Sequence, residues 1–269
     1  MKHPDAAWTQ VHRDWQTLGF VSEPDLQAAG REFDALVALL EAEGVRVSLL
    51  QGNDSTDADS LYTHDPGTTI GHGLVLGSMG KPNRRHEPAA LLTWAREAGV
   101  DVLGAVEAPG LLEGGDLIWL DHKTVALGIG FRSNESGARQ LEELTGLKVI
   151  RVPLPWFQGP GDVLHLMSLI SPLAEDLALV HRPLLPVPFL QELQARGIRT
   201  VDLPPHEYDS LGCNVLALAP RRCLMVHGNP DTRAVLESAG CEVLTFQGDE
   251  IARKGLGGPT CLTRPLVRG

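Results

Sequence analysis

The sequence has no CxxC pair, although it contains four cysteines, at positions 213, 223, 241 and 261. It also lacks any apolar run near the roughly 20 residues that a membrane-spanning helix needs. Its N-terminal stretch has no apolar core of the kind found in secretory signals. These absences argue against a disulfide scaffold and favour a cytoplasmic protein with reduced thiols. A reduced cysteine can act as a nucleophile, although a buried cysteine more often serves as a small apolar side chain.

Positive charge is scarce relative to negative charge. The 23 lysines and arginines are outnumbered by 34 aspartates and glutamates, which gives a formal net charge of −11 with histidine neutral. This balance argues against nucleic acid or an anionic membrane as the main partner, while it allows a local cationic pocket. The histidines do not combine with carboxylates at ligand spacing on one helix face, so we expect no metal site. No linker or low-complexity segment divides the chain, and we predict a single domain over residues 1–269.

A helix-like stretch that ends at glycine and continues into a β-rich run occurs five times. The five glycines are spaced by 43 to 55 residues and are Gly44, Gly99, Gly146, Gly197 and Gly240. Glycine suits this junction because it adopts the left-handed conformation that closes many helices. Hairpin-like pairs such as IWLDHKTVALG and LALAPRRCLMV lie between the junctions and argue against a purely parallel open sheet. Five short units of this kind fit radial repetition around a central axis.

The first and last units carry recognisable helix-start signals. In the first unit, Ser22 is predicted to cap the helix and Pro24 to lie in its first turn. In the last unit, Asn229 is predicted as the cap and Pro230 as the first helical residue.

Polar residues gather where the strand-like runs begin, and a radial fold would direct those positions towards its axis. The segment GLGGPTCL places Cys261 after a glycine-rich turn, and LLEGGDLIWL places Glu113 and Asp116 directly before a buried strand. Carboxylates at such an edge suit the binding of a cation, and the glycines allow close approach to the backbone. An ordinary turn would explain the glycines equally well, so each segment alone is a moderate signal.

Three further segments carry candidate residues. Asp59 and Asp65 flank a β-like run, and His165 is embedded among apolar residues, where a core histidine is the more common explanation. Arg84 and Arg132 lie near predicted helix starts, where the helix dipole disfavours a cation. A bidentate clamp on a carboxylate would explain both arginines, and surface solvation is the alternative.

Taken together, these segments resemble the guanidino-group-modifying enzymes, the superfamily of arginine deiminase, dimethylarginine dimethylaminohydrolase and the amidinotransferases. The resemblance extends from Asp59 to Cys261. Its motifs occur in the family's order: Asp65-Pro66, Arg84 to Glu87, Glu113 to Asp116, Arg132, His165-Leu166 and Gly257 to Cys261. The resemblance implies a five-bladed α/β propeller with pseudo-fivefold ββαβ-type repeats, in agreement with the repeats found in the sequence.

The same resemblance implies the roles of the site residues. Cys261 would be the nucleophile, His165 the acid and base, and Glu113 a carboxylate that holds the guanidinium. The residues implied to bind the substrate are Asp65, Asp59, Arg84 and Arg132. It implies a small guanidino compound as the partner and no cofactor or metal, and it leaves open a homodimer.

Within the superfamily the chain most resembles dimethylarginine dimethylaminohydrolase. Deiminases usually carry an extra helical insertion, and both they and the amidinotransferases usually read His-x-Asp where this chain has Met167. Loss of that acid favours a substituted guanidine, so we expect an N-methylated arginine to give citrulline and an alkylamine through a covalent S-alkylthiouronium intermediate. One departure is His64, where the dimethylarginine hydrolases tend to carry a second acid.

Other functions remain possible on the sequence alone. Arginine deiminase and amidinotransferase are the nearest alternatives, and a non-catalytic binder of arginine derivatives is another. The presence of Cys261, His165 and Glu113 argues against a pure binder, because binding alone requires no thiol.

Overall fold

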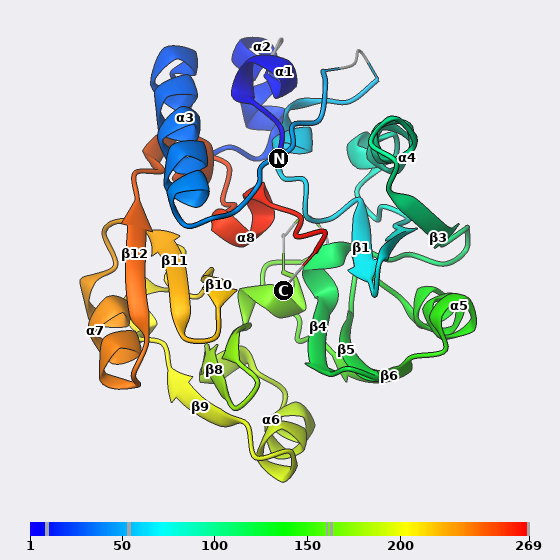
Figure 1. The fold of residues 1–269 in the computed structure, drawn as a ribbon, viewed down its shortest axis with the longest axis vertical. Helices are drawn as coiled ribbons and strands as arrows, with labels where there is room; N and C mark the ends of the chain where they lie inside the picture. Colours follow the sequence, from blue (N-terminus) through cyan, green and yellow to red (C-terminus); the bar gives the residue numbers. More distant parts are fainter. Residues whose placement is uncertain (9–10, 53–54, 160, 162–163, 268–269) are drawn as a thin grey trace.

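The computed structural model describes residues 1–269 apart from 9–10, 53–54, 160, 162–163 and 268–269, and it arranges repeated units around a central axis (Figure 1). The described residues contain four three-stranded sheets. The first two sheets comprise β1 (Gly67–Ile70), β2 (Gly73–Leu76) and β3 (Asp101–Ala105), then β4 (Leu117–Asp121), β5 (Thr124–Ile129) and β6 (Lys148–Pro153). The other two comprise β7 (Ile170–Ala174), β8 (Leu177–Val180) and β9 (Arg199–Asp202), then β10 (Leu216–Ala219), β11 (Arg222–Val226) and β12 (Glu242–Phe246).

All four sheets have the same topology. The first two strands form an antiparallel hairpin, and the third strand pairs in parallel with the second. A crossover helix precedes each third strand: α4 (Glu87–Glu97), α5 (Glu135–Thr145), α6 (Val187–Ala195) or α7 (Pro230–Ser238). Figure 1 shows these helices at the periphery and the strands nearer the axis. The predicted hairpins and mixed sheets are therefore confirmed, and a purely parallel sheet is excluded.

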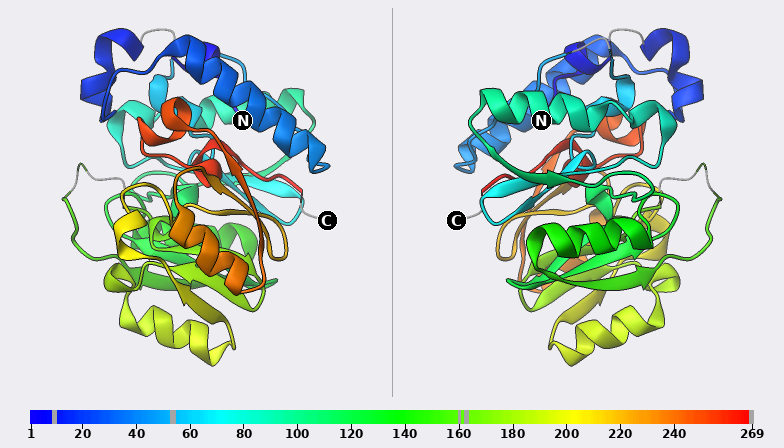
Figure 2. Two further views of the ribbon diagram at one scale, coloured as in Figure 1. Left: turned by 90° about the vertical axis from the view of Figure 1, so that its left-hand side faces the viewer. Right: turned by 90° about the vertical axis from the view of Figure 1, so that its right-hand side faces the viewer.

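The fifth unit is less regular. It contains α3 (Leu26–Ala42), and an isolated parallel bridge between Lys2 and Leu50 takes the place of a sheet among its described residues. The short helices α1 (Pro4–Ala7) and α2 (Val11–Leu18) lie beside α3 at one end of the molecule in both views of Figure 2. The unit also contains the C-terminal helix α8 (Pro259–Leu262). The hydroxyl of Thr69 donates to the carbonyl of Pro265 at 2.6 Å, so the C-terminal segment contacts the first sheet and closes the ring.

Short helical turns connect these elements. The 3-10 turns are Ala58–Leu61, Pro82–Arg84, Gly114–Asp116, Leu166–Ser168, Arg182–Leu184 and Pro205–Glu207, and a π-helical turn spans Asp249–Arg253. Four of them directly follow or contain residues that the sequence assigned to the site. No helix among the described residues has the length and apolar character needed to cross a membrane.

The five repeat glycines adopt the conformation that their position predicts. Gly44, Gly99, Gly146, Gly197 and Gly240 have φ angles of 80°, 66°, 69°, 72° and 90°. In this left-handed region a side chain is strained, which explains why glycine ends each helix. Asn229 and Pro230 also start α7 as predicted.

The predicted start of the first helix is wrong. Asp25, rather than Ser22, is the N-cap of α3, and its side chain accepts a hydrogen bond from the Ala28 N–H at 3.0 Å. The N–H of Asp25 in turn donates to the carboxylate of Glu250 at 2.7 Å. This contact across 225 residues holds the chain at Asp25, so the helix starts after that residue and Pro24 lies outside it.

Apolar and polar burial are spatially separated. Apolar clusters fill the space between each crossover helix and the sheets, as with Leu127 on β5 and Leu141 on α5. Charged side chains are buried instead in the connections near the axis, before a strand or before a crossover helix. These are Asp65, Arg84, Glu113, Arg132 and His165, each at most 5% exposed. Burying charged groups costs free energy, so a cluster of five buried charges indicates a functional centre.

Two alanine substitutions in or after α3 should change stability in opposite directions. Gly44→Ala should lower the free energy of unfolding by about 1 kcal/mol, because its φ of 80° strains a side chain although no atom lies within 4 Å of the added carbon. Gly30→Ala is the matched control inside the helix, where the nearest atom is 3.8 Å away, and it should raise stability by about 0.5–1 kcal/mol. Urea unfolding measures both, and a loss of stability in Gly30→Ala would contradict this account of the repeat.

Candidate active site

One polar residue from each unit reaches the axis from a similar structural position. Asp65 precedes β1, Glu113 precedes β4, His165 precedes β7 and Asn214 precedes β10. Cys261 comes from α8 in the fifth unit. The sequence identified four of these five residues, whereas Asn214 was missed. Its place directly before a strand, in GCNVLALA, was the available signal.

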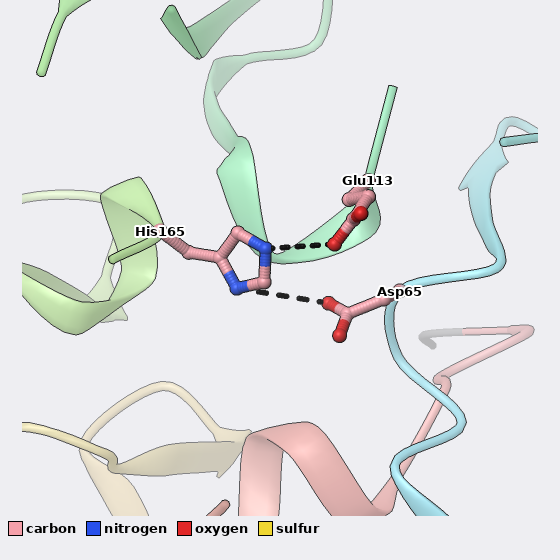
Figure 3. A group of neighbouring side chains, drawn as sticks. All are labelled: Asp65, Glu113 and His165. Carbon is pink, nitrogen blue, oxygen red and sulfur yellow. Dashed lines mark hydrogen bonds and ion pairs between the residues drawn. The ribbon is translucent and has the colours of Figure 1, made fainter. Parts of the chain in front are cut away.

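His165 lies between two carboxylates (Figure 3). Its Nε2 is 3.0 Å from Glu113 Oε2, and its Nδ1 is 3.9 Å from Asp65 Oδ1. Gly115 makes this approach possible, because a Cβ there would lie 2.6 Å from His165 Nδ1 and 2.9 Å from Asp65 Oδ1. Gly115 in the EGGD turn is therefore required because a side chain there would collide with His165 and Asp65, whatever the conformation of the turn.

Backbone donors hold the carboxylates in place. Asp65 accepts from the N–H of Gly115 at 3.1 Å, and Glu113 accepts from the N–H of Gly80 at 2.8 Å. The last acid of the EGGD turn, Asp116, accepts from the N–H of Leu166 at 3.0 Å and so fixes the turn that carries His165. These bonds prearrange the acids before any ligand binds.

Asn214 holds Cys261 in place. The side-chain amide of Asn214 donates to Cys261 Sγ at 3.1 Å, and its oxygen accepts from the N–H of Thr260 at 3.0 Å. The carbonyl of Cys261 accepts from the N–H of His64 at 3.2 Å, which places the turn carrying Asp65 beside the thiol. The other three cysteines are buried in the apolar cluster of the fourth unit.

The site favours a neutral thiol and a protonated imidazole. Burial, and next the negative charge of Asp65, raises the pKa of Cys261 to about 11. Burial alone would lower the pKa of His165, but the charges of Asp65 and Asp116 and the hydrogen bond that His165 donates to Glu113 outweigh it and raise that pKa. Burial opposes ionisation of Asp65 too, yet His165 and Arg84 overcome this and hold the pKa of Asp65 well below its usual range.

Arg84 is fully engaged with partners of the chain. Its Nη1 donates to Asp65 Oδ2 at 2.5 Å, while its Nε and Nη2 donate to the carboxylate of Glu87 at 2.8 Å each. Nη2 also donates to the carbonyl of Tyr62 at 2.9 Å. These contacts favour a role in positioning Asp65, and the predicted role of Arg84 as a carboxylate clamp stays a prediction.

Arg132 retains donor capacity. Its Nε donates to Glu113 Oε1 at 3.0 Å. Its Nη2 is 2.7 Å from Glu113 Oε2, but the angle does not make a hydrogen bond, and this buried atom has no hydrogen-bond partner among the described residues. A ligand anion is one group that would satisfy it, which is compatible with the predicted clamp.

Asp59 lies outside the trio of Asp65, Glu113 and His165. Its Oδ2 is bound by Lys81 Nζ at 2.5 Å and by the side-chain amide of Asn83 at 3.1 Å. Asp59 is 6% exposed, so its predicted contact with a substrate requires access to a position that Lys81 occupies.

Two groups of side chains have the composition of a metal site. Asp65, Glu113 and His165 offer ligand atoms within 4.8 Å of one another, as do the exposed His206 and Asp231 with the buried Glu207. In the first group both carboxylates already face arginines, which compensate their charge. The expectation of no metal and no cofactor stays a prediction.

Comparison with known proteins identifies the class of enzyme to which this arrangement belongs. A ring of ββαβ units with a cysteine, a histidine and paired acids at its axis defines a hydrolase of the superfamily that modifies guanidino groups. The family model described as N,N dimethylarginine dimethylhydrolase, eukaryotic, matches residues 16–268. The chain belongs to this dimethylarginine dimethylaminohydrolase family.

Individual relatives agree with this assignment. The dimethylarginine dimethylaminohydrolase of Streptomyces coelicolor is 29% identical over 86% of this chain and 83% of its own length. Several bacterial arginine deiminases also match, and the chain spans 61% of the one from Bacillus cytotoxicus, at 27% identity.

Solved structures show the same fold. The Pseudomonas aeruginosa dimethylarginine dimethylaminohydrolase, in complex with citrulline, has a TM-score of 0.74 at 22% identity and covers 96% of this chain and 92% of its own. The N-terminal domain of ArgZ, a cyanobacterial arginine dihydrolase, has a TM-score of 0.83 at 20% identity and covers 99% and 98%. The predicted propeller fold is thus confirmed.

The raised pKa of Cys261 predicts how its alkylation depends on pH. Only the thiolate reacts, so the rate of modification by iodoacetamide should rise about tenfold per pH unit from pH 7 to 10. Mass spectrometry of the modified peptide measures this rate, with Cys261→Ser as the control for the three buried thiols. A plateau below pH 8 would show that the free protein already holds a thiolate and would contradict the pKa of about 11.

Proposed function

We propose that this protein hydrolyses a substituted guanidine, with an N-methylated arginine as the first candidate substrate and citrulline and an alkylamine as products. The main support is the convergence of Cys261, Asp65, Glu113 and His165 from four units on one axial centre. His165 Nε2 is 3.0 Å from Glu113, and Asp65 acts electrostatically on both His165 and the thiol. This set offers a nucleophile, two acids for a cation and a proton donor.

Binding of the substrate would prepare the nucleophile. A guanidinium held by Asp65 and Glu113 brings a positive charge near a thiol whose pKa is raised by burial and by Asp65. That charge stabilises the thiolate, so the Cys261 proton leaves to solvent as the cation binds. The free protein, in contrast, keeps its thiol protonated and protected from oxidation.

The two chemical steps then share one histidine. Cys261 Sγ bonds to the guanidinium carbon, and the bond from that carbon to the alkylated nitrogen breaks as His165 gives this nitrogen a proton. The alkylamine leaves, and a thiouronium remains on Cys261. Neutral His165 next takes a proton from water, whose oxygen bonds to the same carbon. The carbon–sulfur bond then breaks, Cys261 takes up the remaining hydroxyl proton, and the neutral ureido product is released.

The residue two positions after His165 supports a substituted guanidine. Met167 is half-buried and packs against the apolar cluster of the third unit, where a carboxylate would offer a further partner for an unsubstituted nitrogen. An apolar side chain there suits an N-methyl group. The alternatives are arginine deiminase, which releases ammonia, and amidinotransferase, in which an amine replaces water.

The nucleophile has a direct test. Cys261→Ser should abolish turnover of N-methylarginine, by at least about 10³-fold, because a serine hydroxyl is far less ionised than the thiol. The folded state should persist, as thermal unfolding by circular dichroism can verify. Cys241→Ser is the matched control, since it removes a thiol remote from the axis. Appreciable turnover by Cys261→Ser would contradict the scheme.

The histidine should affect both chemical steps. His165→Gly should slow release of the alkylamine and hydrolysis of the intermediate, since no other side chain in this scheme donates the proton. Rapid-quench kinetics with mass detection of the covalent adduct on Cys261 separates the two steps. An unchanged rate would remove His165 from the mechanism.

Product analysis distinguishes the alternatives. Incubation with arginine, monomethylarginine, asymmetric dimethylarginine and agmatine should yield methylamines from the methylated substrates at the highest kcat/KM. Ammonia from arginine as the main product would favour a deiminase, and a new guanidino compound formed from an added amine would favour an amidinotransferase. Efficient turnover of agmatine would contradict the carboxylate clamp predicted for Arg132 and Arg84.

A further inference from the structure

A position suited to an ammonium group lies beside the predicted catalytic centre, and the chain itself fills it. Lys81 Nζ is 2.5 Å from Asp59 Oδ2 and donates to the carbonyl of Leu18 at 3.2 Å. This carbonyl belongs to the last residue of α2, where the helix dipole favours a cation. A buried carboxylate and a helix-terminal carbonyl together form a receptor for one ammonium.

The surroundings connect this position to the centre. Lys81 directly follows Gly80, whose N–H binds Glu113, and Arg84, three residues later, binds Asp65. The negative charge of Asp59 also acts on Tyr62, whose carbonyl accepts from Arg84 at 2.9 Å. The ammonium position and the contacts to both guanidinium acids are therefore carried by one short segment, Gly80 to Arg84.

Competition for this position has a physical consequence. An amino-acid substrate carries an α-ammonium in addition to its guanidinium, and Asp59 is a buried acid among the residues predicted to bind the substrate. That α-ammonium can reach Asp59 only by displacing Lys81, whose side chain is 27% exposed and so can swing into solvent. If Lys81 stays, two ammonium groups face each other near one buried carboxylate, which is unfavourable.

We propose that Lys81 determines substrate specificity by occupying the ammonium position of Asp59 and Leu18, so that the site prefers guanidino carboxylates without a free α-ammonium over α-amino acids. This proposal rests on the proposed function and, within substituted guanidines, moves the preferred substrate from N-methylated arginine to its analogue without the α-amino group. Lys81 thereby discriminates between substrates, and it takes no part in the covalent chemistry at Cys261.

Ligand binding tests the proposal without dependence on turnover. In the Cys261→Ser background, calorimetry compares Nω-methylarginine with 5-(N′-methylguanidino)pentanoate, which is the same molecule without its α-amino group. The pentanoate should bind about tenfold tighter. Adding Lys81→Met should reverse this order, because Asp59 then lacks its partner and accepts the α-ammonium of methylarginine.

Two further variants separate selection from support of the fold. Lys81→Arg keeps the positive charge and should keep the preference for the pentanoate. Lys123→Met removes an exposed lysine on the β4–β5 turn and should change neither affinity. Urea unfolding of each variant verifies that it is folded.

Each outcome discriminates. If Lys81→Met weakens both ligands equally, Lys81 only supports α2 and the proposal is overturned. If methylarginine binds tighter than the pentanoate with Lys81 present, the proposal is overturned as well. Absence of binding by both ligands at millimolar concentration would overturn this proposal together with the proposed function. Binding with the expected preference, but without turnover by the unmodified protein, would overturn only the proposed function.

Discussion

Buried carboxylates that face buried cations are the interaction on which this structure depends. Asp65 and Glu113 are 5% and 0% exposed, and they stay ionised there because Arg84 and Arg132, also buried, lie against them. Loss of either partner would leave an uncompensated charge in the interior, which is strongly destabilising. The same balance determines the chemistry: His165 keeps its proton because acids surround it, and Cys261 keeps its proton because it is buried beside Asp65. Stability and reactivity are therefore set by one group of charges.

A short connection between β2 and α4 organises most of that group. Gly80 donates its N–H to Glu113, Lys81 binds Asp59, and Arg84 binds Asp65. Asn83 adds contacts to Asp57 and Asp59. Residues adjacent in sequence thus serve carboxylates from two different units, so a shift of this connection would disturb the guanidinium acids and the ammonium position together. The proposed substrate selection and the proposed catalysis would therefore be coupled through it.

The repeat was predictable because its signals are local. A helix closed by Gly146 and a hairpin such as β4–β5 depend on backbone conformation and on alternation of apolar residues within a few turns of chain. The start of α3 was predicted wrongly because a remote carboxylate, Glu250, binds the N–H of Asp25 and overrides the local preference for Ser22. Asn214 was missed because an amide before a strand resembles any turn residue until Cys261 Sγ is placed 3.1 Å away.

By itself, the sequence determined the ββαβ units, the glycines that end their helices and the order of the polar motifs, because each follows from residues that are neighbours along the chain. Only the tertiary structure decided which of those polar residues pair with each other. It placed Arg84 on Asp65 and Glu87, left a donor of Arg132 unused, and put Lys81 on Asp59. Partner choice among buried charges depends on distances across the axis of the ring, and these arise only when the five units close around it.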